Sequence, residues 1–448
     1  MRIDRLIIKN FKGFEERVLD FPQGGSAEVL DSSRVMESPE NELQGSFHLL
    51  IGENGCGKST ALDALAIAVG IWHVARPTAG WRAIRPGEAR LVARQYDETV
   101  RFDPQPDPSI TAQGSIGGHL VEWTRMNKGL STKTTNLRAK RALEVVEGLL
   151  ARSRTDERVT LPVIAYYSAG RAFLPAKERT SKFEMKLSKV SRFDAYYYCL
   201  DGRTRDREIN QWFLFEAVET GQRGHKRQGL LAVEEAVLRC VPGATHLRID
   251  SDRKEVVIGL KNGEMPFYSL SDGQRSMLAL VADLAIKAVI LNPHLGRDAA
   301  KKSPGVVLID ELDMCLHPTW QQHVLEDLRA AFPNVQFIAS THSPFLVQTA
   351  REGEVLKMDG NLAVEPSTLS IEEVARLAMD VTETEKSPRY QEKLNTAREY
   401  LKLVNEAKGA DPVRRAEIHT QVTAMLAPFT DNPAYTALLE RKGIISKD

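Results

Sequence analysis

The segment 52–60, GENGCGKST, has the residue types and the spacing of a phosphate-binding loop. Gly52, four further residues and then Gly57-Lys58-Ser59 match the pattern G-x-x-x-x-G-K-[ST], in which backbone N–H groups and a helix N-terminus converge on phosphate oxygens. Lys58 is predicted to bridge the terminal phosphates of a nucleotide, and the Ser59 hydroxyl to bind Mg²⁺. Cys56 fills a variable position that favours a small side chain. The full set of predicted nucleotide-binding residues is Gly52, Asn54, Gly55, Gly57, Lys58, Ser59 and Thr60.

Two adjacent carboxylates, Asp310 and Glu311, end the apolar run 305–311. A short apolar run of this kind predicts a buried strand, and open α/β sheets bind ligands at the carboxyl ends of their strands. Asp310 is therefore predicted to hold the Mg²⁺ through water. Glu311 is predicted to be the general base that polarises the attacking water.

Two further segments could contact the terminal phosphate of the nucleotide. The segment LSDGQRS at 270–276 leads directly into an apolar helical pattern, so Ser271 and Gly273 lie at a helix start, which is an anion site. Such a site is useful where it faces the γ-phosphate held by a neighbouring chain. The segment THSP places His342 directly after the predicted strand 334–340, within reach of the γ-phosphate.

The elements that must position these residues follow from the hydrophobic pattern. Residues 1–21 predict two strands around a turn at Lys12-Gly13, and 22–46 predicts a polar excursion before the strand of the phosphate loop. Residues 71–125 predict an irregular insertion. Helices are predicted over 61–69, 132–158, 212–218, 229–240 and 277–292, and strands over 161–171, 245–250, 255–260, 266–270, 305–311 and 334–340.

Composition excludes several classes of protein. The chain has 448 residues and zero formal net charge, with 60 Lys plus Arg and 60 Asp plus Glu, so any contact with nucleic acid must use a local patch. Its 4 cysteines lack the spacing of a disulfide framework or metal site and suit a reducing cytosol. The N-terminus lacks the apolar core of a signal peptide, and no apolar run approaches the ~20 residues of a membrane helix. We therefore expect a cytoplasmic protein without a membrane partner.

The four motifs GENGCGKST, LSDGQ, VLIDE and STHSP stand in the order found in ABC-type ATPases, and the chain resembles the branch with RecF, SMC-like and OLD-like proteins. The resemblance implies an α/β fold in which a P-loop NTPase core with a mixed sheet forms an ATPase head. It implies ATP and Mg²⁺ as cofactors. It also implies dimers in which the signature residues Ser271, Gly273 and Gln274 act in trans, with Asp313 in the loop between subunits. The glutamine expected between phosphate loop and signature is not evident, and Gln95 and the strand end at 168–170 are the candidate positions.

The resemblance also divides the chain into four parts. Residues 1–70 would be the N-terminal part of the head, 71–265 an inserted α/β lobe with a helical subdomain, 266–365 the C-terminal part of the head, and 366–448 a helical region.

A narrower resemblance is to bacterial ATPases that include the PtuA subunit of Septu and retron-linked anti-phage systems. The segments that carry it are RIDRLIIKNFKGF, LPVIAYYSAGR, the segment 191–212 and the helical tail. It implies an oligomeric ATPase that partners an HNH-type nuclease encoded beside it. The tail has neither the carboxylate-bearing strands of a TOPRIM nuclease nor a Cys/His cluster, so we expect no nuclease site in this chain.

Two other functions stay open at this point. One is a RecF-like DNA-repair ATPase, in which the basic segments 171–192 and 203–227 bind duplex DNA directly. The other is the nucleotide-binding subunit of a membrane transporter, against which the long lobe at 71–270, the THSP ending and the helical tail all count.

Overall fold

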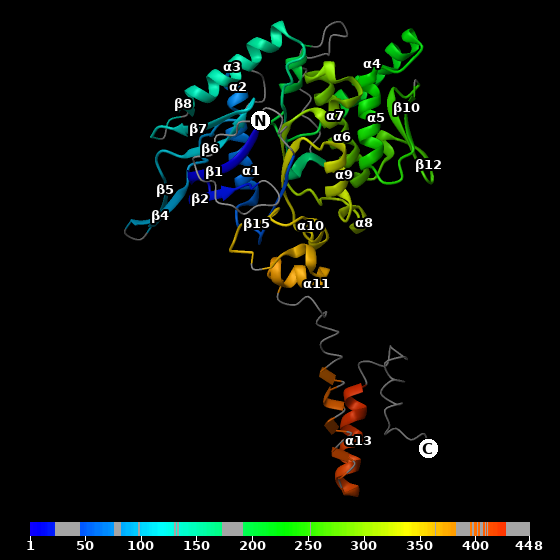
Figure 1. Cartoon of the computed structure of the whole chain (residues 1–448). Helices are drawn as coiled ribbons and strands as arrows, with labels where there is room; N and C mark the ends of the chain where they lie inside the picture. The colour runs from blue at the N-terminus through cyan, green and yellow to red at the C-terminus, as the bar shows by residue number, and fades with distance from the viewer. Residues whose placement is uncertain are drawn as a thin grey trace. The chain divides into compact units, whose positions relative to one another are not determined.

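The chain divides into two units, Met1–Met379 and Asp380–Asp448, in a computed structural model. The structure describes residues 1–22, 45–75, 82–96, 99–129, 131, 134–172, 191–250, 252–362, 364–381 and most of 395–426. All the predicted site residues lie in the first unit (Figure 1). The boundaries predicted at residues 70, 265 and 365 stay predictions.

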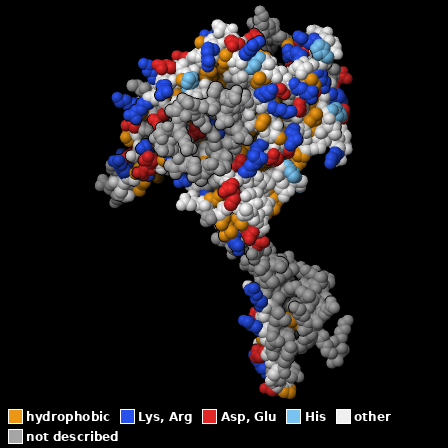
Figure 2. Space-filling model, viewed as in Figure 1, with side chains coloured by type: hydrophobic (Ala, Val, Ile, Leu, Met, Phe, Trp, Pro, Cys, Tyr) orange, Lys and Arg blue, Asp and Glu red, His pale blue; other side chains and the backbone are white. Residues whose placement is uncertain are grey.

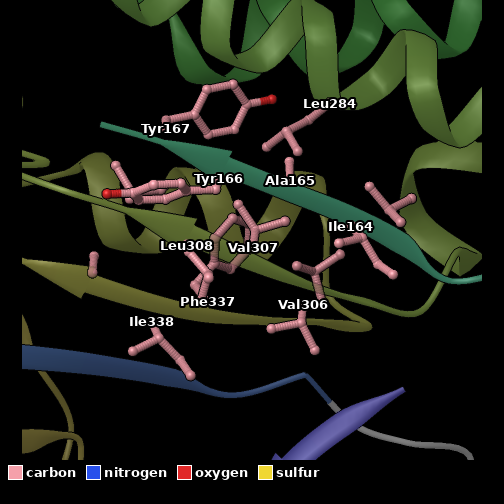
Figure 3. Packing of buried hydrophobic residues seen from close by; sticks show 14 of the residues in the cluster. Ile164, Ala165, Tyr166, Tyr167, Leu284, Val306, Val307, Leu308, Phe337 and Ile338 are labelled. Carbon is pink, nitrogen blue, oxygen red and sulfur yellow. The ribbon is translucent and has the colours of Figure 1, made fainter. Parts of the chain in front are cut away.

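The first unit contains a parallel five-stranded sheet in the order β15-β3-β14-β13-β9. Every residue of β3, β9, β13 and β14 is buried, as a parallel sheet covered on both faces requires. Figure 3 shows side chains of β9, β13 and β14 packed with Leu284 of a covering helix. The strands are β3 (Phe47–Ile51), β9 (Val163–Tyr167), β13 (Gly305–Ile309), β14 (Val335–Ser340) and β15 (Val355–Lys357).

A second five-stranded sheet is antiparallel, in the order β2-β1-β6-β7-β8. Its strands are β1 (Arg2–Phe11), β2 (Phe14–Asp20), β6 (Ser109–Ile116), β7 (His119–Asn127) and β8 (Thr134–Arg138). The predicted hairpin around Lys12-Gly13 is confirmed, because Phe11 pairs with Phe14. The α/β fold is confirmed too, with parallel and antiparallel strands in separate sheets.

Two sequence predictions fail in this region. Residues 71–125 are not irregular, because β6 and β7 alternate between buried and open positions and β6 pairs with β1 along its length. A short helix, α2 (Ile71–Ala75), and a two-stranded sheet, β4 (Leu91–Tyr96) with β5 (Thr99–Pro104), also lie there. The helix predicted over 132–158 begins only at α3 (Lys140–Thr155), since the β-branched pair Thr134 and Thr135 is extended in β8.

Helices join the two sheets and cover them. The phosphate-loop helix α1 (Lys58–Val69) contacts both sheets, and the long apolar helix α6 (Asp272–Leu291) packs on β9. The helices α4 (Asp206–Arg223) and α5 (Gln228–Cys240) contact α6 and confirm the helices predicted there. The remaining helical turns of this unit are η1 (Ala169–Ala172), η2 (Arg192–Tyr196), η3 (Phe267–Ser269), η4 (Pro293–Asp298), α7 (Ala299–Lys302), α8 (Pro318–Gln321), α9 (Val324–Ala331), α10 (Pro344–Thr349), η5 (Pro366–Thr368), α11 (Ile371–Glu373) and η6 (Val374–Ala378).

A small antiparallel sheet lies beside α4 and α5, formed by β10 (His246–Asp250), β11 (Glu255–Leu260) and β12 (Gly263–Pro266). The strand predicted over 266–270 is wrong. The chain turns there as η3, with the Leu270 N–H bonded to the Phe267 carbonyl, and so delivers Ser271 to the start of α6.

The second unit contains α13 (Pro412–Leu426), as the helical spacing predicts. The end of the expected helical region, residues 427–448, and nearly all of the excursion at 22–46 lie outside the described residues. Within the part of the chain that the structure describes, no helix combines the length and the apolar character needed to span a bilayer.

Candidate nucleotide-binding and catalytic site

The phosphate loop joins β3 to α1 through backbone conformations that require glycine. Gly52, Gly55 and Gly57 have φ values of 139°, 88° and 103°. At Gly57 a Cβ atom would also lie 2.3 Å from the ring of Phe14. At Gly52 it would lie 2.8 Å from the Asp359 carboxylate, which accepts a hydrogen bond of 2.6 Å from the N–H of Glu53. The two ends of the loop therefore have no room for side chains.

The Lys58 side chain is buried beneath this loop. Its ammonium donates to the carbonyls of Gly52 at 2.7 Å and of Glu53 at 3.0 Å. Those bonds close the loop around the lysine, at the start of α1, where helix N–H groups favour an anion. Asn54 and Gly55 are exposed at the tip of the loop, and Cys56 and Thr60 are half-buried.

Asp310, directly after β13, joins the phosphate loop to the neighbouring strand. Its carboxylate accepts hydrogen bonds from the Ser59 hydroxyl at 3.1 Å and from the Ser340 hydroxyl, at the end of β14, at 2.5 Å. A serine hydroxyl and a carboxylate at hydrogen-bonding distance are oxygen ligands of the kind that Mg²⁺ prefers. The residues present therefore fit the predicted cation.

Glu311 follows in a turn with a left-handed backbone, at a φ of 50°. Its N–H donates to the Ser340 hydroxyl at 2.8 Å, and its carbonyl accepts from Arg171 at 2.8 Å. The Glu311 side chain is half-buried, and none of these bonds uses its carboxylate. The turn is thus fixed through the backbone, and the carboxylate extends from it at the carboxyl edge of the sheet.

Asp313 connects this turn to the segment that carries His342. The Asp313 carboxylate accepts from the Thr341 hydroxyl at 2.6 Å and from the His342 N–H at 3.3 Å. The His342 side chain is exposed. Asp310, Glu311, Asp313 and His342 therefore lie together after two adjacent strands, and the roles predicted for them stay predictions.

The signature residues start α6 by capping it. The Ser271 hydroxyl accepts from the Gln274 N–H, and the Gln274 side chain accepts from the Ser271 N–H at 3.2 Å. Gly273 packs against the carbonyl of Cys315, which a Cβ atom would approach to 2.1 Å. Ser271 is exposed, so the helix start is open to solvent in the single chain. Action in trans stays a prediction.

Sequence reasoning missed three contributors to this site, namely Arg171, Ser340 and Asp359. Ser340 lies within the quoted motif STHSP, and Arg171 follows the small residues that end a buried strand, so both positions carried a signal. Gln95, a candidate for the missing glutamine, lies in the separate sheet β4-β5, which holds none of these residues.

Comparison with family models finds AAA domains over most of the first unit. Residues 5–220 match a model described as "AAA domain". Residues 174–348 match one described as "AAA domain, putative AbiEii toxin, Type IV TA system". The two matches together include the phosphate loop, the signature and both carboxylates.

Three curated proteins are similar to the chain. "Retron Ec83 probable ATPase" from Escherichia coli is 25% identical over 78% of this chain and 70% of that protein. "Retron Vc95 probable ATPase" from Vibrio cholerae serotype O1 biovar El Tor is 34% identical over 41% of this chain and 37% of that protein. "Septu protein PtuA" from Bacillus mycoides (strain KBAB4) is 39% identical over 79% of this chain but 40% of that protein. The chain thus spans well under half the length of the latter two relatives.

Among solved structures, an SmcHead bound to the C-winged helix domain of ScpA aligns with a TM-score of 0.45 and 16% identity, over 79% of this chain and 93% of that one. The family models and the curated relatives support an AAA-type ATPase related to the retron ATPases and to PtuA, in agreement with the phosphate loop and the Asp310–Glu311 turn.

Proposed function

We propose that the protein is a Mg²⁺-dependent ATPase that works as a homo-oligomer and controls a partner nuclease in anti-phage defence. The catalytic half of the proposal is carried by the junction at which Ser59 and Ser340 both donate to the Asp310 carboxylate, beside Glu311. The biological half is supported by the names of the relatives, which are retron and Septu proteins.

The chemistry follows from the positions of the side chains. Ser59 and Asp310 would hold the Mg²⁺, which when bound offsets the charge of the phosphates. Lys58 would exchange its carbonyl partners for phosphate oxygens. Glu311 would accept the proton of the attacking water. His342, at the adjacent strand end, would donate a hydrogen bond to the γ-phosphate.

A second copy of the chain would complete the site. The N-terminus of α6, with Ser271, Gly273 and Gln274, begins at an exposed serine and would bind the γ-phosphate held by the partner copy. Asp313 would lie between the subunits. Because Asp313 is bonded to Thr341 and His342, its position depends on the segment that would contact the phosphate.

Direct DNA binding through residues 171–192 is less well supported. Arg171 is buried, and Arg192 donates to the carbonyls of Leu291 at 2.7 Å and Val159 at 2.5 Å. Both ends of that basic segment are therefore engaged within the protein, and 173–190 lies outside the described residues. Figure 2 shows basic and acidic side chains interspersed over the face that it presents.

The proposal is tested by the solution mass of the Glu311→Gln protein with and without ATP and Mg²⁺, alone and mixed with the product of the neighbouring gene. We expect ATP to produce an oligomer that captures the nuclease. An ATP-dependent dimer that binds DNA with a steep salt dependence and no nuclease would favour the repair function instead.

The role in trans has its own test, Ser271→Arg. The variant is expected to bind ATP normally as a protomer and to lose the ATP-dependent oligomer, because the large arginine side chain would block the start of α6. Unchanged turnover in Ser271→Arg would refute the role in trans.

A further inference from the structure

Arg171 is a buried arginine beside the turn that carries Asp310 and Glu311. It lies in η1, directly after β9, and its side chain is 5% exposed. Its two terminal nitrogens donate to consecutive backbone carbonyls, those of Asp310 and, at 2.8 Å, Glu311. The guanidinium therefore binds the peptide groups of the catalytic turn, and not the carboxylates beside it.

Three hydrogen bonds hold the segment that carries Arg171. The Asp310 N–H donates to the Tyr167 carbonyl at 2.7 Å, so β9 is bonded to β13 up to the turn itself. The Ser168 N–H donates to the Gly202 carbonyl at 2.8 Å, and the Thr204 hydroxyl donates to the Arg171 carbonyl at 3.3 Å. Arg171 therefore projects toward the catalytic turn from a fixed base.

The same strand end is bonded to the signature helix. The Tyr167 hydroxyl donates to the Asp283 carboxylate of α6 at 2.6 Å, and Lys287 of α6 donates to that carboxylate as well. Figure 3 shows the Tyr167 ring on the side of the sheet that faces the helix bearing Leu284. Tyr167 thus links α6 to the catalytic turn, because its hydroxyl bonds to Asp283 and its carbonyl accepts from the Asp310 N–H.

The turn that Arg171 contacts is one that needs external support. Glu311 has a left-handed backbone, which a residue with a Cβ atom adopts only when its surroundings impose it. Ser340 fixes the N–H of Glu311, and Arg171 fixes its carbonyl. Burial lowers the pKa of the Arg171 guanidinium, and the carboxylates of Asp310, Asp313 and Glu311 oppose that shift.

We propose that Arg171 is a positioning residue for ATP hydrolysis: it holds the peptide groups of Asp310 and Glu311 so that the Glu311 carboxylate points at the attacking water. The inference rests on the proposed role of Glu311 as general base. Arg171 does not touch the nucleotide in this arrangement, so its loss is expected to change turnover and leave ATP affinity intact.

The test compares Arg171→Lys and Arg171→Gln with Arg192→Ala. Lysine keeps the charge but replaces the two-pronged donor by a single ammonium, and glutamine keeps one amide donor without charge. Arg192 is the matched control, because it also donates to several backbone carbonyls but lies away from the turn. The measurements are kcat, the Kd for ATP and the melting temperature of each variant.

We expect both Arg171 variants to lose about 10- to 100-fold in kcat, as for a catalytic group displaced by about 1 Å, with Kd for ATP changed less than about threefold. Arg192→Ala should lower the melting temperature and leave kcat of the folded protein unchanged. Full kcat in Arg171→Lys and Arg171→Gln, or a parallel loss of kcat and ATP affinity in both, would overturn the role of Arg171.

A double variant separates this inference from the function on which it rests. In the Glu311→Gln background Arg171→Lys should have no further effect on kcat, because Arg171 acts through Glu311. An equal loss in both backgrounds would show that Arg171 acts by another route. Normal hydrolysis by Glu311→Gln alone would instead overturn the proposed base, whereas an inactive Glu311→Gln beside fully active Arg171→Lys and Arg171→Gln would remove only the positioning role.

Discussion

The parallel sheet β15-β3-β14-β13-β9 and the antiparallel sheet β2-β1-β6-β7-β8 both pack against α1, and they serve its opposite ends. The parallel sheet places β3 and β13 so that the phosphate loop and Asp310 meet at the N-terminus of α1. The antiparallel sheet supports the other end, where Trp123 donates to the Ala68 carbonyl at 3.0 Å and Arg125 to the Ile67 carbonyl at 2.7 Å. Both carbonyls belong to the last turn of α1, where helix carbonyls run out of intrahelical donors, and the Ala68 carbonyl also accepts from the N–H of the cap residue Gly70.

The hydrogen bonds at the two ends of α1 differ in whether a ligand could replace them. At the C-terminus of α1, Trp123 and Arg125 are fully buried. At the N-terminus, in the proposed mechanism, Lys58 would exchange its bonds for phosphate oxygens and Ser59 would coordinate the metal ion. In the proposed mechanism, one sheet therefore carries the chemistry and the other holds the helix on which that chemistry depends.

The sharpest test of the catalytic side is Glu311→Gln. Removing the proposed general base is expected to lower kcat about 10²- to 10⁴-fold and to leave the Kd for ATP and the melting temperature unchanged. Steady-state hydrolysis, equilibrium binding and thermal unfolding measure the three quantities. Glu352→Gln, in the exposed turn before β15, is the matched control and should hydrolyse ATP normally. Comparable rates in the two variants would remove Glu311 from the mechanism.

The supporting side is tested by Trp123→Ala. The ring is fully buried, so its loss is expected to lower the free energy of unfolding by about 3–5 kcal/mol. Leu120→Ala is the control from the same strand, because Leu120 is 63% exposed and its truncation should cost under about 1 kcal/mol. Denaturant unfolding gives both values. Turnover per folded molecule should survive in Trp123→Ala, and its specific loss would show that the antiparallel sheet takes part in the chemistry.

The contrast between the parallel and the antiparallel sheet also explains which parts of the structure could be predicted from the sequence. The strands β3, β13 and β14 are mostly apolar and end in recognisable motifs, so both the elements and the site at their ends are visible locally. The strands β6 and β8 contain polar residues that weaken the apolar pattern, and β6 also pairs with β1, which lies far away in the chain. Arg171 belongs to this second kind, because its burial depends on carbonyl groups of another strand and not on its neighbours in sequence.

Lys58→Ala is expected to have a smaller effect than either of those changes. It removes the cation that would bind the phosphates, so the Kd for ATP should rise about 10- to 100-fold. Stability should change little, since only the two carbonyl contacts of the loop are lost. Isothermal titration measures the affinity, with Lys140→Ala, an exposed lysine of α3, as the control. An affinity loss as large in Glu311→Gln as in Lys58→Ala would break the division of roles between binding and hydrolysis.

The smallest effect is expected at the ion pair between Arg5 of β1 and Asp20 of the edge strand β2. Both side chains are about half exposed, at 46% and 57%, and bond at 2.5 Å. Water screens such a pair, so a double-mutant cycle with Arg5→Ala and Asp20→Ala should give a coupling of about 0–1 kcal/mol, which vanishes in ~1 M salt. If the coupling instead exceeded about 2 kcal/mol and resisted salt, the antiparallel sheet would depend on its surface charges. Its support of α1 could then not be assigned to buried contacts such as that of Trp123.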